Sequence, residues 1–225
     1  DDGIFVFECQ YLLDIYRNNI VGTFFHEHLY HHSLESLENL FNLHSLNFFH
    51  VEKAKIQKGS IIGYVAKKSE NLNKTIHYKK LMKVEKEKNL SIKSLKMVKK
   101  YINIQKSKYI NIISKFKINE IGIYGSARSG PIYFENLSMS NRIKYIFDDH
   151  ELKINKFSPL INKKILPTND IYVLKLKALI ILAYLHSKKI IEKNLKFLQD
   201  GGIFITVYPE VRVINKSNYK KFIWK

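Results

Sequence analysis

The chain has 225 residues, of which 45% are hydrophobic and 13% aromatic, a composition typical of a packed globular protein rather than a disordered one. Its 38 basic and 20 acidic residues give a formal net charge of +18. Only four of the basic residues are arginine (positions 17, 128, 142 and 212), the side chain best suited to reading bases and clamping phosphates. We therefore expect no nucleic-acid partner.

Cysteine content and hydropathy indicate the cellular compartment and whether the chain contacts a membrane. The single cysteine, Cys9, cannot form an internal disulfide or a multi-cysteine zinc site, which fits a reducing cytoplasm. The most apolar run, residues 171–185, is interrupted by Lys175 and Lys177 and is shorter than the roughly 20 residues that span a bilayer. We expect a cytoplasmic protein with no membrane partner. Because the sequence opens with Asp1 and not methionine, we also expect that this is not its natural start.

The first third of the chain predicts a strand, two short helices and a hairpin. Aromatic and β-branched residues indicate a strand over 3–8, followed by a helix over 11–17. A second helix over 33–41 has Ser33 as its N-cap, but a full capping box is not expected because the third following position is Ser36. Residues 46–51 and 60–66 predict two strands of one sheet that turn near Lys58-Gly59.

A lysine-rich segment follows, over residues 68–117, and contains neither glycine nor proline. Its apolar residues recur at helical spacing, which predicts one or two long amphipathic helices linking two α/β units. We interpret its charges as a solvated face rather than a binding surface.

The last part of the chain predicts a small Rossmann-like domain. A strand over 121–124, the loop 125–130, a helix to about 137 and a strand over 143–147 ending in Asp148-Asp149 have the layout of a dinucleotide-binding unit. Further elements are expected at the following positions: a strand over 179–183, a helix over 187–199 and a strand over 203–207.

The densest cluster of titratable groups is the segment 24–32, Phe-Phe-His-Glu-His-Leu-Tyr-His-His. Imidazoles here could act as general bases or metal ligands. The zinc-protease pattern H-E-x-x-H fails, because Tyr30 stands where its second histidine is required. A metal site through His26, His28 and His31 or His32 stays open, as does a loop surface without a chemical role; we predict no metal.

At this cluster the chain resembles the S-adenosylmethionine-dependent nucleotide-sugar C-methyltransferases, which carry a Tyr-His-Glu-His motif. The resemblance extends in order along the chain, over Glu8, Leu12-Leu13, 22–33, 59–66, 122–130, 147–149, 182–184 and 208–214. It implies an α/β protein: a remnant of a class I methyltransferase sheet over 1–67, a helical linker over 68–117 and a Rossmann-like nucleotide-sugar-binding domain over 118–225.

The resemblance also implies a reaction, methylation of the carbon beside the ketone of a nucleotide-linked 4-keto-deoxysugar. It makes His28 the base and Glu27 its electrostatic or hydrogen-bonding partner. Phe25 occupies the position of the motif's tyrosine, and this is a departure because phenylalanine cannot donate a hydrogen bond to a ketone or enolate.

In the last domain we expect eight substrate-binding residues: Tyr124, Gly125, Arg128, Ser129, Asp148, Asp149, Tyr184 and Arg212. Amides of the Gly125 loop suit a diphosphate that Arg128 could neutralise, and the aspartates stand where a ribose hydroxyl is often bound. The sequence equally allows a tight structural turn and a loop-capping role for the aspartates. Ser129 replaces the family's usual Lys or Arg, and Tyr184 its usual Trp.

The family's cysteine-rich zinc lobe and its S-adenosylmethionine-binding turn both lie upstream of the matched segments. The cofactor and the zinc are therefore expected only in a complete enzyme, with a missing amino-terminal half as the partner of this chain. We expect the chain alone to be inactive in methyl transfer. Two alternatives stay open: a non-catalytic nucleotide-sugar-binding module or degenerate fragment, and an NAD(P)-linked reductase, which the lack of a G-x-G-x-x-G pattern disfavours.

Overall fold

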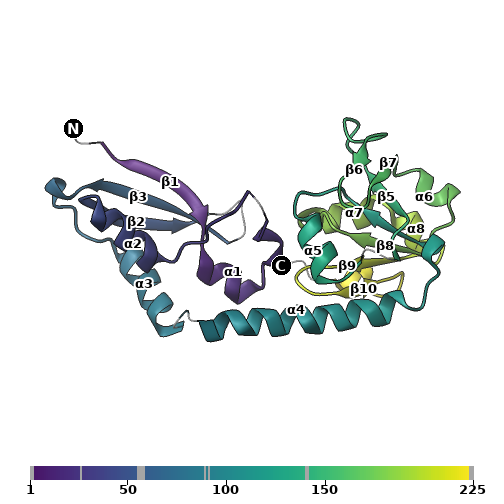
Figure 1. Ribbon diagram of the computed structural model, residues 1–225, viewed down its shortest axis with the longest axis horizontal. Coiled ribbons are helices and arrows are strands. Elements are labelled where there is room, and N and C mark those ends of the chain that lie inside the picture. The colour runs from purple at the N-terminus through teal and green to yellow at the C-terminus, as the bar shows by residue number, and fades with distance from the viewer. Residues whose placement is uncertain are drawn as a thin grey trace. The chain divides into compact units, whose positions relative to one another are not determined.

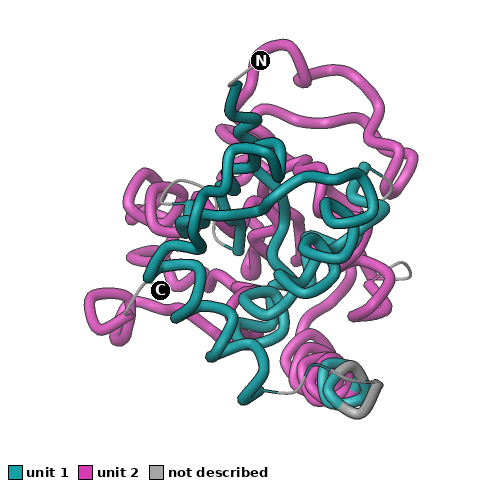
Figure 2. Tube along the Cα trace, turned by 90° about the vertical axis from the view of Figure 1, so that its left-hand side faces the viewer, with its two compact units in different colours: residues 1–99 teal, residues 100–225 magenta. Residues whose placement is uncertain are grey.

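The computed structural model describes residues 3–25, 27–54, 59–88, 90, 92–139 and 142–222. The chain divides into two compact units, residues 1–99 and 100–225, coloured teal and magenta in Figure 2. Both mix helices and strands, as the sequence predicts. Among the described residues no helix is both long and apolar enough to cross a membrane.

The first unit is built on a three-stranded antiparallel sheet (Figure 1). Its strands are β1 (Phe5–Gln10), β2 (Leu46–Lys53) and β3 (Ser60–Lys67), in the order β1-β3-β2. The predicted pairing of the two later strands is confirmed, and Gly59 beside their turn has a φ of +82°; Lys58 lies outside the described residues. Helices α1 (Leu12–Asn18), α2 (Leu34–Leu43) and α3 (Ile76–Lys88) complete the unit.

Helix α2 begins with a reciprocal cap that the sequence did not predict. Ser33 Oγ accepts from the Ser36 amide, and Ser36 Oγ accepts from the Ser33 amide, both at 3.0 Å. Our expectation that no capping box forms was wrong, because a serine hydroxyl reaches the N-cap amide as a glutamate would. The next two amides, those of Leu34 and Glu35, donate to the carboxylate of Glu85 on α3 at 2.8 and 3.0 Å.

The predicted helical segment contains α3 and α4 (Ile92–Ile113). Helix α3 packs into the first unit, where the ring of Tyr78 lies 5.1 Å from that of Phe48. The boundary between the units falls within α4, at residues 99 and 100. The domain ranges 1–67, 68–117 and 118–225 stay predictions.

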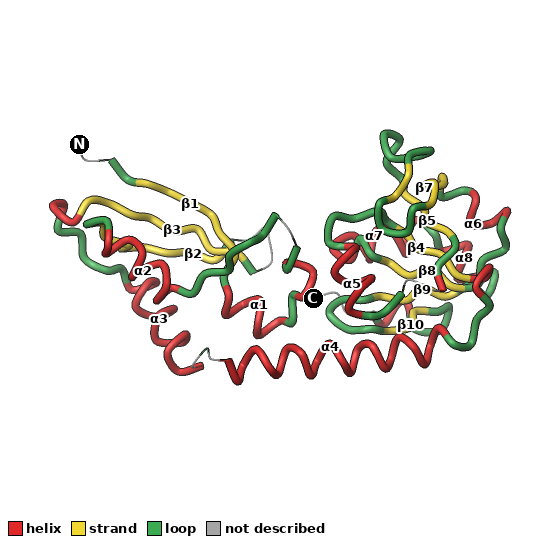
Figure 3. Tube along the Cα trace, in the orientation of Figure 1, coloured by secondary structure: helices red, strands yellow, loops and turns green. Residues whose placement is uncertain are grey.

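The second unit contains a seven-stranded, mostly parallel sheet (Figure 3). Its order is β10-β9-β8-β4-β5-β7-β6, and only the two outermost pairs are antiparallel. The strands are β4 (Ile121–Tyr124), β5 (Tyr145–Asp148), β6 (Phe157–Ser158), β7 (Lys163–Pro167), β8 (Ala178–Ile181), β9 (Ile203–Thr206) and β10 (Arg212–Ile214). This confirms an α/β Rossmann-like fold. The order of parallel strands reverses between β4 and β8, the place where such sheets bind ligands at their carboxyl ends.

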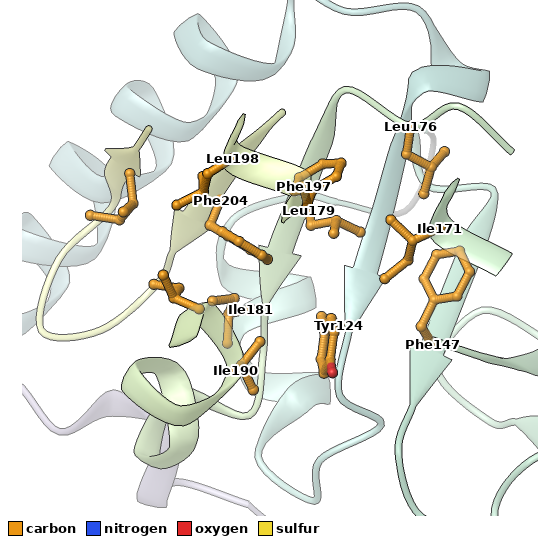
Figure 4. Packing of buried hydrophobic residues seen from close by; sticks show 12 residues of the cluster. Tyr124, Phe147, Ile171, Leu176, Leu179, Ile181, Ile190, Phe197, Leu198 and Phe204 are labelled. Atoms are coloured by element: carbon orange, nitrogen blue, oxygen red, sulfur yellow. The ribbon is translucent and has the colours of Figure 1, made fainter. Parts of the chain in front are cut away.

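Helices complete this unit: α5 (Gly130–Asn136), α6 (Asp170–Val173), α7 (Ser187–Lys193) and α8 (Leu195–Gln199). Alternate strand residues such as Leu179 and Ile181 pack with Ile190 and Phe197 of α7 and α8 in one core (Figure 4). The prediction of a single helix over 187–199 was wrong, because the segment forms the two helices α7 and α8. Asn194 interrupts it, and its side chain donates to the Ile190 carbonyl at 2.8 Å.

Candidate functional site

The histidine segment of the first unit is held between β1 and α2. It follows the short 3-10 helix η1 (Val21–Thr23). Its far end is fastened to β1, because the His32 amide donates to the Gln10 carbonyl at 3.3 Å and the Leu12 amide to the His32 carbonyl at 2.8 Å. The His28 amide donates to the Phe25 carbonyl at 2.8 Å. These bonds place His28 in a turn fixed at both ends.

His28 is oriented by two neighbours. Its Nδ1 atom lies 3.1 Å from Oγ1 of Thr23, which is buried. Its ring centroid lies 4.3 Å from that of Phe25 at an interplanar angle of 39°. The ring is half-buried, and Glu27 is exposed. Phe25 therefore packs against the predicted base, while Thr23 rather than an acidic residue meets its Nδ1 atom.

His31 is a second imidazole near His28: its ring centroid lies 6.5 Å from that of His28 and 4.6 Å from that of Phe24. Burial first, and the proximity of His28 second, lower the pKa of His31 below its ordinary value. The lowered pKa favours the neutral imidazole of His31.

A metal centre at this loop has no support in the described part of the chain. No group of three or more His, Cys, Asp or Glu side chains there could hold a metal ion. His26, the first ligand of the metal site that the sequence left open, lies outside the described residues.

In the second unit, five of the predicted binding residues gather at the carboxyl ends of the parallel strands. These are Tyr124, Gly125, Asp148, Asp149 and Tyr184. Gly125 has a φ of +95°, and a Cβ atom there would lie 2.6 Å from that of Ala183. Only glycine lets the loop after β4 pass so close to the loop after β8.

Asp148 caps the loops around it. It accepts hydrogen bonds from the amides of Ser126 at 2.8 Å and His150 at 2.9 Å, and Lys153 Nζ lies 3.0 Å from it. The Gly125 amide donates to the Phe147 carbonyl at 2.7 Å. A ribose or diphosphate bound here would have to replace these bonds or use the remaining amides.

Asp149 binds side chains from three other segments of the chain. Tyr124 Oη donates to it at 2.7 Å, Thr168 Oγ1 at 2.9 Å and Lys193 Nζ at 2.5 Å. Burial alone would raise the pKa of Asp149, but the bonds from Lys193, Tyr124 and Thr168 together lower it. Tyr124 is 2% exposed, so its ring anchors Asp149 from within the core.

The other predicted residues have different surroundings. Arg128 is exposed, and Ser129 is the N-cap of α5 without a side-chain capping bond. Arg212 on β10 is paired with Glu210, its Nε donating to Oε1 at 2.7 Å. All eight assignments stay predictions.

The structure adds two tyrosines that the sequence analysis did not assign to the site, Tyr133 and Tyr208. The predicted Tyr184 lies between them, with its ring centroid 5.5 Å from that of Tyr133 and 5.0 Å from that of Tyr208. Burial raises the pKa of Tyr184 to about 12. Thr23 and Gln10 were also missed, since they stand 5 and 18 residues before His28 in other elements, η1 and β1, so that no single periodic pattern joins them to it. The Tyr208-Pro209-Glu210 segment, matched at the sequence level, was the available signal for Tyr208.

S-adenosylmethionine, the cofactor that the resemblance implies, is expected to bind upstream of the matched segments, and the turn after β4 is not assigned to it. The Ser126 amide and Asp148 in this turn are bonded to each other, so the ribose or phosphate of any ligand would have to displace that bond or use other amides. No step that runs through the donor can be derived from this turn.

Two comparisons with known proteins found matches to this chain. Residues 55–209, more than half of the chain, match the family model described as the C-methyltransferase C-terminal domain. The chain is 25% identical over 223 residues to the C-methyltransferase NovU of Streptomyces niveus. That match covers 96% of this chain and 53% of NovU, so the chain spans about half the length of the curated relative.

Proposed function

Because the chain belongs to the family of C-methyltransferase C-terminal domains, we propose that it supplies the substrate-activating half of an enzyme that methylates a carbon of a nucleotide-linked 4-keto-deoxysugar. The observation that carries this proposal is the half-buried His28, held by Thr23 at 3.1 Å and packed on Phe25. An imidazole so fixed can act as a general base near neutral pH.

The chemistry assigned to His28 is removal of a proton from the carbon beside the ketone. The imidazole takes the proton, and the electron pair of the broken C–H bond moves into the enolate, with its charge on the ketone oxygen. S-adenosylmethionine would supply an electrophilic methyl group when bound to the complete enzyme. Phe25 donates no hydrogen bond, so another group must stabilise the enolate oxygen.

The second unit is the proposed holder of the nucleotide. Its strand order reverses between β4 and β8, and Tyr184 follows β8 at that edge. A half-buried tyrosine between two others offers an aromatic surface for a nucleobase. The cofactor site and the catalytic partner half are proposed to lie in sequence beyond this chain.

Proton exchange tests this function without a methyl donor. The chain would be incubated with a nucleotide-linked 4-keto-deoxysugar in D2O, and loss of the α-proton signal followed by NMR. We expect His28→Ala to slow the protein-dependent exchange by about 10²-fold or more. His44→Ala, which removes an exposed histidine after α2, is the matched control and should exchange like the wild type.

Calorimetry with the same nucleotide sugar separates the outcomes. Binding with exchange that depends on His28 supports the enzyme. Binding without exchange supports the non-catalytic binding module, and exchange that His28→Ala leaves unchanged contradicts the assignment of the base.

A further inference from the structure

We propose that Thr23 and Gln10 are positioning residues that keep the proton of neutral His28 on Nδ1, so that Nε2 is its basic nitrogen. This inference rests on the proposed role of His28 as the base. It concerns three hydrogen bonds that join four side chains in a continuous line from β3 into the histidine loop: Ser60, Gln10, Thr23 and His28.

The line starts where β1 and β3 pair, with Gln10 directly opposite Ser60. Gln10 Nε2 donates to Ser60 Oγ at 3.3 Å, which turns the carbonyl oxygen of the same amide toward Thr23. Thr23 Oγ1 donates to that oxygen, Gln10 Oε1, at 3.1 Å. An amide oxygen only accepts, so the hydroxyl hydrogen of Thr23 is committed to this bond.

A hydroxyl has one hydrogen and two lone pairs. With its hydrogen given to Gln10, Thr23 Oγ1 can only accept from the ring nitrogen that lies 3.1 Å away, Nδ1 of His28. Neutral imidazole carries its proton on one nitrogen and a lone pair on the other. The proton on Nδ1 therefore leaves the lone pair on Nε2.

Burial enforces this direction. Thr23 is 5% exposed and Ser60 is 2% exposed, so water cannot readily substitute for a missing partner. If His28 instead presented a lone pair at Nδ1, Thr23 would have to turn its hydrogen toward the ring, and Gln10 Oε1 would lose its donor.

The arrangement also suits the charged product of proton transfer. When Nε2 takes the carbon-bound proton, the imidazolium still donates from Nδ1 to Thr23, and no side chain has to move. Packing against Phe25 at 4.3 Å restrains the plane of the ring. Thr23 thus sets which nitrogen reacts without touching the substrate.

The test is the tautomer of His28, measured on the full chain labelled with 15N at its histidines. Long-range 1H–15N correlation spectra at alkaline pH distinguish a protonated Nδ1 from a protonated Nε2, and the spectrum of His28→Ala assigns the resonances. We expect Nδ1–H in the wild type. A wild-type spectrum showing Nε2–H overturns the proposal, whatever the variants do.

Two substitutions isolate the hydroxyl. Thr23→Val keeps the shape of the side chain but removes the oxygen. We expect His28 in this variant to become a mixture of tautomers, and α-proton exchange to slow by about tenfold or more. The affinity for the substrate should not change. Thr23→Ser should restore both the Nδ1–H spectrum and the rate. An Nδ1–H spectrum in Thr23→Val identical to wild type contradicts the role of Thr23.

This readout is independent of the proposed reaction. If the wild type shows Nδ1–H but no protein catalyses α-proton exchange, the positioning role of Thr23 is supported. The proposed role of His28 as the base is then contradicted.

Discussion

Asp148 and Asp149 are adjacent in the chain but hold different parts of the second unit. Asp148 accepts hydrogen bonds from backbone amides of the two loops beside it. Asp149 instead binds side chains from β4, from α7 and from the loop before α6. Consecutive residues at a strand end point in opposite directions, which lets the pair serve both purposes. The sequence placed the doublet correctly at the end of β5 but could not reveal these partners.

Asp149→Asn should destabilise the protein in a pH-dependent manner. Because the folded-state pKa of Asp149 is lowered, its contribution to stability is present above its ordinary pKa of 3.8 and is lost as the pH falls through the lower folded value. We expect a loss of about 1 kcal/mol at neutral pH, since the carboxylate is partly exposed. Urea unfolding across a pH series measures it, and Asp200→Asn, at an exposed site, should show no such trend.

Glycine conformation gives a second residue-scale prediction. Gly125 and Gly201 have φ values of +95° and +88°, but a Cβ atom would lie 2.6 Å from Ala183 at the first and meet nothing within 4 Å at the second. Gly201→Ala should therefore cost about 1 kcal/mol from backbone strain alone. Gly125→Ala should cost a further ~1–3 kcal/mol from the clash. Equal losses in urea unfolding would contradict the contact between the two loops.

At the level of elements, α2 depends on a carboxylate from another helix. Glu85 is 5% exposed and accepts the amides of Leu34 and Glu35, which α2 itself cannot satisfy. Since α2 begins directly after the histidine loop, this contact also fixes the end of that loop.

Glu85→Ala should destabilise the protein by about 2–3 kcal/mol, because two helix amides lose a buried charged acceptor. Glu87→Ala, an exposed change on the same helix, is the control and should stay within ~0.5 kcal/mol of wild type. Unfolding followed by circular dichroism measures both. A similar loss in both variants would mean that α3 stability, and not the cap on α2, is responsible.

Strands built from apolar runs were predicted from the sequence, whereas a strand without such a run and the break between α7 and α8 were missed. The aromatic and β-branched runs that form β1, β3, β4 and β8 stand out in the sequence. Strand β7 reads Lys-Lys-Ile-Leu-Pro, and its lysines and proline conceal it. The same limit applies to the site, since motif residues such as His28 were visible, whereas Thr23 and Gln10 are connected to it only by the fold.

On the scale of the whole molecule, β1 is notable for its exposure. Ile4, directly before the strand, and Phe5 and Val6 within it are 54%, 58% and 51% exposed. Because alternate residues point to opposite faces, the described part of the chain exposes apolar side chains on both faces at this end of the sheet. Within the described residues β1 pairs only with β3. An apolar strand with an open edge is a template for further pairing.

We expect the isolated chain to self-associate through β1 as its concentration rises. Val6→Lys should shift this equilibrium toward monomer, measured by sedimentation velocity. Val173→Lys removes an apolar side chain that is 77% exposed in the second unit, and should leave association unchanged. Equal effects of the two substitutions would point to general solubility instead of the strand edge.

The helix α4 crosses the boundary between the two compact units: residues 92–99 belong to the first unit and residues 100–113 to the second. Hydrogen-bonded turns of a helix melt cooperatively with their neighbours, so loss of one unit would fray α4 from that end. Native-state hydrogen exchange should accordingly show two plateaus of amide protection within this one helix, each equal to the opening free energy of the unit that holds it.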